Sequence, residues 1–381
     1  MPYITIAQSP TYRQITFEEI LSGQIDESSI ILRDNVSNTR TYYTETIRQE
    51  FRKQFNIGGM IVALSEFLDE FGYLYDVPRH TLYHTFQLPK KSGGYRTINA
   101  PNDDLMKALR KLKDIFEQKM FAMYHTSAYA YVKKRAPKQA IERHQKNNSK
   151  WFLKVDFSDF FGSTTKQFTM DILSQIFPFS EIYKNTSGRE LLERAIDLCF
   201  LNGGLPQGTP ISPMLTNLLM IPIDHYFSKV LRDFDKHRFV YTRYADDILI
   251  SCQHDFNYRK VIGMMRDVLR KFNAPYHFKD EKTHYGSSAG SNWNLGVMLN
   301  KDNNITIGHE NKKKLRAMIC NYVLDRQHGM RWALHDVQVL AGHINYFRGI
   351  EQEYVDGVIK YNNRKFRTNV MNMIRNDLAG R

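Results

Sequence analysis

The chain contains few cysteines and lacks long apolar runs, and both absences narrow the class of protein. Its three cysteines, Cys199, Cys252 and Cys320, are scattered, so they form neither a zinc-binding spacing nor a disulfide framework. No run of eighteen apolar residues occurs, and the N-terminus lacks the charged and apolar blocks of a signal peptide. We therefore expect a cytoplasmic protein with buried free thiols and no membrane partner.

Internal repeats, low-complexity tracts and long linkers are also missing, which favours one compact, multi-lobed unit. Hydrophobic residues make up 42% and aromatic residues 13% of the 381 residues, as in globular proteins. Acidic residues are outnumbered by Lys and Arg, 40 against 53, and the formal net charge is +13. This excess indicates a polyanionic partner, nucleic acid first and an acidic membrane surface second.

Two adjacent carboxylates stand in the middle of a predicted β-hairpin, Tyr241–Ile250. The tight connection carries Asp246 and Asp247, between strand-forming residues on one side and an apolar run on the other. Neighbouring carboxylates repel each other, and a divalent cation such as Mg²⁺ would remove that cost. Taken alone, the turn is better explained as solvated, so the rest of the chain has to decide.

A third carboxylate, Asp156, ends an apolar run, Phe152–Val155, that predicts a buried strand. An unpaired carboxylate is expensive to bury, which favours a functional role. Asp159 follows and is expected to cap the next helix, whereas Phe160 and Phe161 are more typical of a core.

Glycine and proline dominate the loop Leu201–Pro213, which precedes a predicted helix, Met214–Phe227. Gln207 lies in this loop and is a candidate for contacting a base or a sugar. A plain helix-entry loop is the simpler explanation for Gln207 alone.

A hairpin is predicted over Tyr83–Pro101, with a Gly-rich, basic tip. Lys90, Lys91 and Arg96 could close over a phosphate there, because glycine permits close approach and the cations supply charge. An ordinary solvated hairpin explains the pattern equally well. Further helices are predicted over 105–120, 166–200 and 258–272, residues 309–381 read as helical and basic, and residues 1–75 read as a helical extension.

In this order, these stretches resemble the motifs of reverse transcriptases. The resemblance rests on Leu88–Arg96, Val155–Asp156 with Phe160–Phe161, Leu205–Pro213, Tyr244–Asp247, Glu281–Thr283, Leu295–Gly296 and Leu340–Phe347, and it covers about residues 80 to 350. It implies an α+β, right-hand polymerase fold: a helical extension over 1–75, fingers and palm over 76–300 and a basic thumb over 301–381.

The resemblance also implies a chemistry, RNA-directed DNA polymerisation by two-metal nucleotidyl transfer. Asp156, Asp246 and Asp247 would hold two Mg²⁺ ions, assisted by the backbone carbonyl of Phe157. The other implied site residues bind substrates: Lys90, Lys91 and Arg96 the triphosphate, Phe161 as a steric gate against the ribose 2′-hydroxyl, Gln207 the nucleotide pocket, Tyr244 and Ala245 the primer end, and Lys282 beside the active site. The implied partners are dNTPs, an RNA template and a DNA product.

The subclass is less defined by the sequence. Retron enzymes carry an Asn-Ala-x-x-His element and a Val-Thr-Gly element, where this chain has Ala140–His144 and Asn294–Gly296. These departures favour a defence-associated enzyme that works with a dedicated non-coding RNA against phage, together with an effector protein or as a homo-oligomer. The alternatives are a retron enzyme that makes multicopy single-stranded DNA and an RNA-binding maturase or scaffold with secondary polymerase activity.

Overall fold

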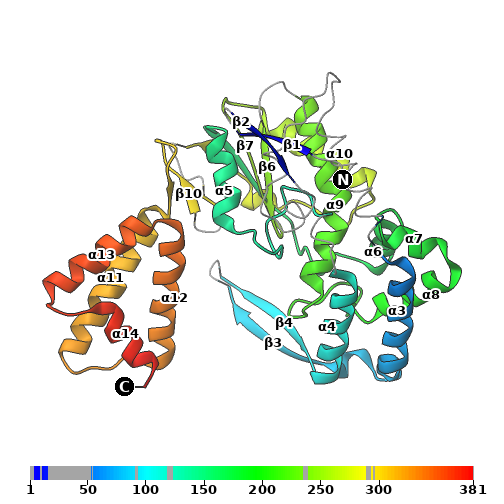
Figure 1. Ribbon diagram of the computed structural model, residues 1–381, viewed down its shortest axis with the longest axis horizontal. Helices are drawn as coiled ribbons and strands as arrows, with labels where there is room; N and C mark the ends of the chain where they lie inside the picture. The colour runs from blue at the N-terminus through cyan, green and yellow to red at the C-terminus, as the bar shows by residue number, and fades with distance from the viewer. Residues whose placement is uncertain are drawn as a thin grey trace.

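The computed structural model (Figure 1) describes residues 4–8, 11–15, 53, 55–90, 93–117, 123–234, 239–288, 293–294 and 297–380. Lys91 and the pair Leu295–Gly296 lie outside the described residues, so the roles expected for them stay predictions.

The centre of the molecule is a four-stranded antiparallel sheet in the order β6-β7-β5-β8. Its strands are β5 (Trp151–Asp156), β6 (Val240–Tyr244), β7 (Asp247–Cys252) and β8 (His284–Ser287). Both predicted strands of the Asp246–Asp247 hairpin are confirmed, as is the strand that ends at Asp156. The central strands β5 and β7 place buried apolar side chains on both faces of the sheet.

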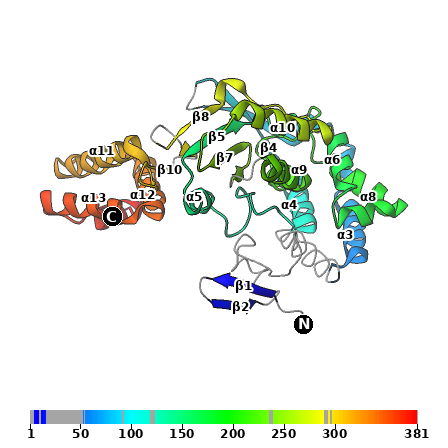
Figure 2. The same ribbon diagram turned by 90° about the horizontal axis from the view of Figure 1, so that it is seen from above.

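Side chains alternate across these strands, so each face has its own neighbours. Leu153, Val155, Ile248 and Ile250 belong to a core that also includes α9 (Ser212–Phe234) and α10 (Tyr258–Lys271). Phe152 and Leu249 belong to a second core with Ile141 of α5 (Pro137–Lys146). The sheet therefore separates two hydrophobic cores, with α9 and α5 labelled on its two sides in Figure 2.

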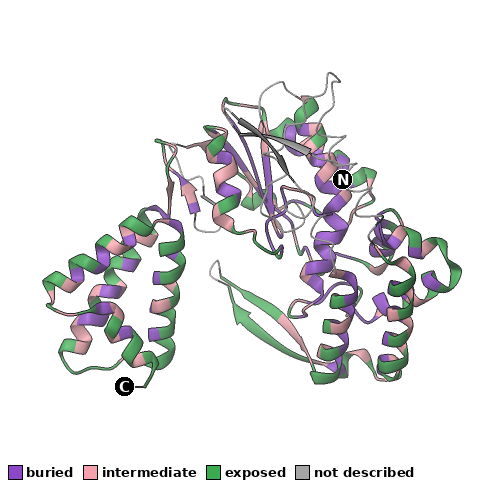
Figure 3. Ribbon diagram, viewed as in Figure 1, coloured by how far each residue is buried: buried purple, intermediate pink, exposed green. Residues whose placement is uncertain are grey.

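A long hairpin and a group of helices extend from one side of this sheet. The hairpin consists of β3 (Tyr83–Pro89) and β4 (Tyr95–Pro101), as predicted, and most of it is exposed (Figure 3). The helices are α3 (Ile57–Phe71), α4 (Asp103–Glu117), α6 (Lys166–Leu173), α7 (Phe179–Lys184) and α8 (Thr186–Asp197), with short 3-10 turns at Gly72–Tyr75 and Arg79–Leu82. These helices share the core that contains α9 and α10.

The C-terminal lobe lies at the other side of the molecule in both views (Figures 1 and 2). It is helical, as predicted, and comprises α11 (Gly308–Gln327), α12 (Leu334–Ile350), α13 (Gln352–Lys365) and α14 (Val370–Leu378). A small sheet of β9 (Trp293–Asn294), β10 (Val297–Leu299) and β11 (Ile305–Thr306) leads into it. The lobe's buried residues belong to the second core, together with Phe152 and Leu249.

Two local features differ from the prediction. The N-terminal extension contains a hairpin, β1 (Ile4–Gln8) and β2 (Thr11–Ile15), besides the helix α3. Thr165, not Asp159, caps α6, because Asp159 sits in a turn with a left-handed φ of 41°. The lobe boundaries at 75 and 300 stay predictions. Among the described residues, no helix is both long and apolar enough to cross a membrane.

Candidate active site

Three carboxylates meet at one end of the central sheet. Asp156 and Asp247 are direct cross-strand partners on β5 and β7, so their side chains lie on the same face. Asp246 occupies the two-residue turn between Tyr244 and Asp247, and its carbonyl accepts a hydrogen bond from the Phe157 N–H at 3.1 Å. The fold therefore brings the three predicted catalytic residues to one place from two separate stretches of sequence.

Lysines neutralise two of these carboxylates. Asp156 Oδ1 accepts a hydrogen bond from Lys279 Nζ at 2.9 Å, and Asp156 Oδ2 lies 3.4 Å from Lys282 Nζ. Asp247 Oδ1 lies 3.0 Å from Lys154 Nζ. Lys282 is thus next to Asp156, whereas sequence reasoning missed Lys279 and Lys154. The position of Lys154 was readable, because it lies two residues before Asp156 on the same face of the strand.

The charges of the cluster interact. Burial raises the pKa of Asp246, and the nearby charges of Asp156 and Asp247 raise it further. Burial works against the charge of Lys279, but the hydrogen bond and the charge of Asp156 outweigh burial and raise the Lys279 pKa. A positive charge is therefore favoured beside these carboxylates, and here lysine ammonium groups provide it.

The donor set fits a divalent metal in kind, because carboxylate oxygens are what Mg²⁺ prefers. Across the described part of the chain, no three His, Cys, Asp or Glu side chains converge closely enough to hold a metal ion as they stand. In this structure Asp156 and Asp247 pair with lysine ammonium groups.

The Pro-Gln-Gly loop packs against the loop that carries Phe161. Leu205 donates its N–H to the Phe161 carbonyl at 3.1 Å, and the Phe161 side chain is half-buried against the first core. Phe157 and Phe160 stack with ring centroids 5.3 Å apart and are buried, so Phe161, which is half-buried, is the most accessible of the three. The predicted gate residue and Gln207 therefore come from loops that are held together.

The same loop also touches the β3–β4 hairpin. Gln207 accepts a hydrogen bond through its carbonyl from the Asn99 N–H at 2.8 Å. Gly208 has a left-handed φ of 113°, and a Cβ there would lie 2.9 Å from Ile98 Cγ2, so only glycine fits this contact. Lys90 and Arg96 are exposed on this hairpin.

The charge environment of Tyr131 includes residues of the candidate site. Burial raises the pKa of its hydroxyl, and the charges of Asp246 and Tyr244 raise it further, whereas Arg96 lowers it. The Tyr131 side chain is 50% exposed, and its backbone φ is 59°. It therefore lies within electrostatic reach of both Asp246 and Arg96.

Tyr244 and Ala245 lead into the catalytic turn. Tyr244 is half-buried. Burial raises the pKa of Tyr346 on α12, and the nearby Tyr244 raises it further. Ala245 is buried, with a φ of 56°, the sign that the first position of a primed two-residue hairpin turn requires.

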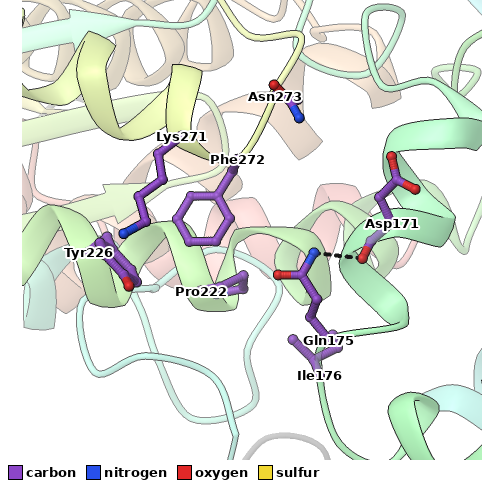
Figure 4. Close-up of a pocket in the computed structure, with 8 residues that line it drawn as sticks. All are labelled: Asp171, Gln175, Ile176, Pro222, Tyr226, Lys271, Phe272 and Asn273. Carbon is purple, nitrogen blue, oxygen red and sulfur yellow. Dashed lines mark hydrogen bonds between the residues drawn. The ribbon is translucent and has the colours of Figure 1, made fainter.

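A separate pocket of about 470 Å³ lies between α6, α9 and α10. Figure 4 shows Lys271 over the Tyr226 ring, at 4.2 Å from the ring centroid, and Gln175 bonded to the Asp171 carbonyl. None of the predicted site residues lines it.

Comparison with known proteins identifies the family of this chain. The family "Reverse transcriptase (RNA-dependent DNA polymerase)" matches residues 88–318. The retron Ec73 reverse transcriptase of Escherichia coli is 26% identical over 277 residues, 71% of this chain and 83% of the relative. The retron Ec83 reverse transcriptase of the same organism is 25% identical over 293 residues, 74% of this chain and 86% of the relative.

Solved structures with a fainter likeness include the apo telomerase from Candida tropicalis. The TM-score is 0.45 at 11% identity, and the match covers 74% of this chain and 58% of the telomerase chain. The family assignment rests on the family match, which spans Asp156, Gln207, Asp246 and Asp247, and not on the small likeness to solved structures. The chain therefore belongs to the reverse transcriptases, the RNA-directed DNA polymerases, and has their right-hand polymerase fold.

Proposed function

We propose that this reverse transcriptase extends a primer along an RNA template with dNTPs, using Asp156, Asp246 and Asp247 as ligands for two Mg²⁺ ions. The convergence of the three carboxylates at one end of the sheet carries this proposal. When bound, the two ions would activate the attacking hydroxyl and stabilise the leaving pyrophosphate. The Phe157 carbonyl, directly after Asp156, would serve as a further ligand.

The substrate residues would act around these carboxylates. Lys90 and Arg96, with Lys91, would bind the triphosphate from the fingers hairpin. Phe161 would exclude the ribose 2′-hydroxyl, supported by its partly exposed ring and by its backbone bond to the loop that holds Gln207.

Tyr244 and Ala245 would lie at the primer end, and Lys282 would leave Asp156 to contact phosphate. The basic helices of the thumb, α11 to α13, would hold the hybrid through its backbone and 2′-hydroxyls.

We further propose a retron-type enzyme that copies a dedicated non-coding RNA in the cytoplasm, within an antiphage system. The retron relatives support a retron-type enzyme, whereas the altered motifs favoured a defence-associated enzyme outside the retrons. The altered Ala140–His144 element retains a role in the fold: His144 is buried, and its ring nitrogens bond Ser251 Oγ at 2.5 Å and Thr242 Oγ1 at 2.8 Å. The altered sequence of this element is therefore a weak argument against a retron-type enzyme.

Purified protein, Mg²⁺, a primed RNA template and labelled dNTPs test the polymerase proposal. Asp246→Asn should abolish incorporation, whereas the matched control Asp233→Asn, an exposed carboxylate at the end of α9, should leave it unchanged. Equal incorporation by both variants would contradict the catalytic assignment.

Sequencing of the nucleic acid that co-purifies with wild type tests the retron proposal, because it reports template and product together. The expected result is one structured RNA joined to or copied into single-stranded DNA. RNA binding that persists without any DNA product would favour the scaffold alternative, which the net charge of +13 supports. A phage-plating assay with the same Asp246→Asn variant tests the defence role.

A further inference from the structure

We propose that Arg243, held by Asp224 and Asn217, is a positioning residue that fixes the turn carrying Asp246 and Asp247 from behind the sheet. This inference rests on the proposed function of those carboxylates. Arg243 is on β6, three residues before Asp246, and it is 1% exposed. It is therefore shut off from any substrate and can act only through the residues it touches.

Arg243 points to the face of the sheet opposite the carboxylates. Its side chain meets α9, where Nη2 lies 2.8 Å from Asp224 Oδ2 and Nε lies 2.9 Å from Asp224 Oδ1. The pair is bidentate, and Asp224 is also 1% exposed. Such a pair fixes the guanidinium plane, because both charges would be uncompensated in any other position.

The remaining nitrogen of the guanidinium reaches the catalytic turn. Nη1 donates to the Ala245 carbonyl at 3.2 Å and to Asn217 Oδ1 at 3.0 Å. Ala245 holds a φ of 56°, which an L-residue adopts at a cost. The hydrogen bond from Arg243 offsets the cost of this backbone conformation. The carbonyl that accepts it belongs to the peptide group that links Ala245 to Asp246.

Asn217 extends the support to the Tyr131 loop. Its Nδ2 donates to the Ala130 carbonyl at 2.7 Å, directly before Tyr131. The backbone of Arg243 pairs with the same loop, since its N–H donates to the Ser127 carbonyl at 2.7 Å and its carbonyl accepts from the Tyr129 N–H at 2.9 Å. Two buried residues, Arg243 and Asn217, thus join α9, the turn that carries Asp246 and the loop that presents Tyr131.

Stability alone does not require this arrangement. Replacing a buried ion pair by apolar residues of similar volume is often neutral for folding. What an apolar pair could not supply is a donor for the Ala245 carbonyl next to two catalytic carboxylates. The position of the carboxylates matters at a finer scale than folding, because a displacement of about 1 Å can lower a rate about a hundredfold.

The test compares Arg243→Lys and Asn217→Ala with Tyr241→Phe. Tyr241 donates to Asp224 Oδ1 at 2.6 Å in the same buried network. Within the described ranges it makes no hydrogen bond to Ala245 or Asp246, so it is the matched control. Three quantities are measured on the full chain: steady-state kcat and KM for dNTP on a primed RNA template, the melting temperature, and hydrogen exchange at the Phe157 amide, which is bonded to the Asp246 carbonyl.

We expect Arg243→Lys and Asn217→Ala to lower kcat about tenfold or more, with KM within about twofold of wild type. The Phe157 amide should exchange faster in both variants, with and without substrate. Tyr241→Phe should change neither kcat nor this exchange, even if it lowers the melting temperature as much. Should Arg243→Lys fail to fold, Asn217→Ala decides.

Two results would overturn the inference: kcat losses that track the melting temperature equally in all three variants, or unchanged exchange at Phe157 in folded Asn217→Ala. An inactive wild type would instead count against the proposed function. The exchange measurement separates the two cases, because it reports the turn without requiring polymerisation.

Discussion

The contact between Gly204 and Gly162 offers a sharp test of how the loop Leu201–Pro213 is held against the loop that carries Phe161. A Cβ added at Gly204 would lie 2.0 Å from the Gly162 carbonyl oxygen and 2.7 Å from the carbonyl carbon. Both atoms are backbone, so no side-chain rotation relieves the clash in Gly204→Ala. The loop Leu201–Pro213 must then move away from the loop that carries Phe161.

The cost follows from two contributions. Overpacking against immobile atoms costs about 3 kcal/mol, the upper part of the usual range. Separation of the loops also breaks the bond from the Leu205 N–H to the Phe161 carbonyl, which is worth about 1 kcal/mol. We therefore expect Gly204→Ala to lose about 4 kcal/mol of unfolding free energy, and KM for dNTP to rise because Gln207 and Phe161 no longer face one nucleotide together.

Urea unfolding followed by intrinsic fluorescence gives the free energy, and primer extension at varied dNTP concentration gives KM. Gly286→Ala is the matched control, since a Cβ at this strand glycine meets nothing within 4 Å. A Gly204→Ala protein with the stability and the KM of Gly286→Ala would refute the reasoning.

Three further predictions concern the carboxylates and the gate. Phe161→Ala should raise rNTP relative to dNTP incorporation by about tenfold to a hundredfold in competition assays, since a small residue no longer excludes the 2′-hydroxyl. The raised pKa of Asp246 means that its contribution to stability is present below the ordinary aspartate value of 3.8 and is lost as pH rises through the raised value. Asp246→Asn should therefore increase the metal-free melting temperature at pH 7 while abolishing activity, and an unchanged or lower melting temperature would contradict this. Lys279 lowers the Asp246 pKa, so Lys279→Met should move the acid limb of the activity profile to higher pH, whereas an unmoved limb would show that Lys279 does not influence the site.

Much of the site was predictable because its residues lie at the ends of regular elements. Apolar runs and strand-forming residues located β5 and the β6–β7 hairpin, and strand pairing then brings Asp156 beside Asp247. The helix α10 followed from its periodicity to within one residue. Short-range pattern and chemistry were sufficient for these features.

The unpredicted features depend on contacts that are distant in sequence. Lys279 bonds Asp156 across 123 residues, and no local pattern marks it. Asp159 had the residue type of a helix cap, but the turn that follows β5 gives it a left-handed backbone, and Thr165 takes the cap instead. The glycines at 204 and 208 looked like loop formers, whereas their role is close approach to another backbone.

The division of the sheet between two cores has a consequence for how the chain unfolds. Phe152 and Leu249 belong to the core of the C-terminal helices, whereas Leu153 and Ile248, their neighbours on the same strands, belong to the core of α9 and α10. Two hydrophobic cores that share one sheet can unfold one after the other, so unfolding need not follow a single two-state transition. We expect the C-terminal lobe to unfold as a separate unit. Because β5 and β7 contribute to both cores, unfolding of this lobe would expose one face of the strands that end at Asp156 and begin at Asp247.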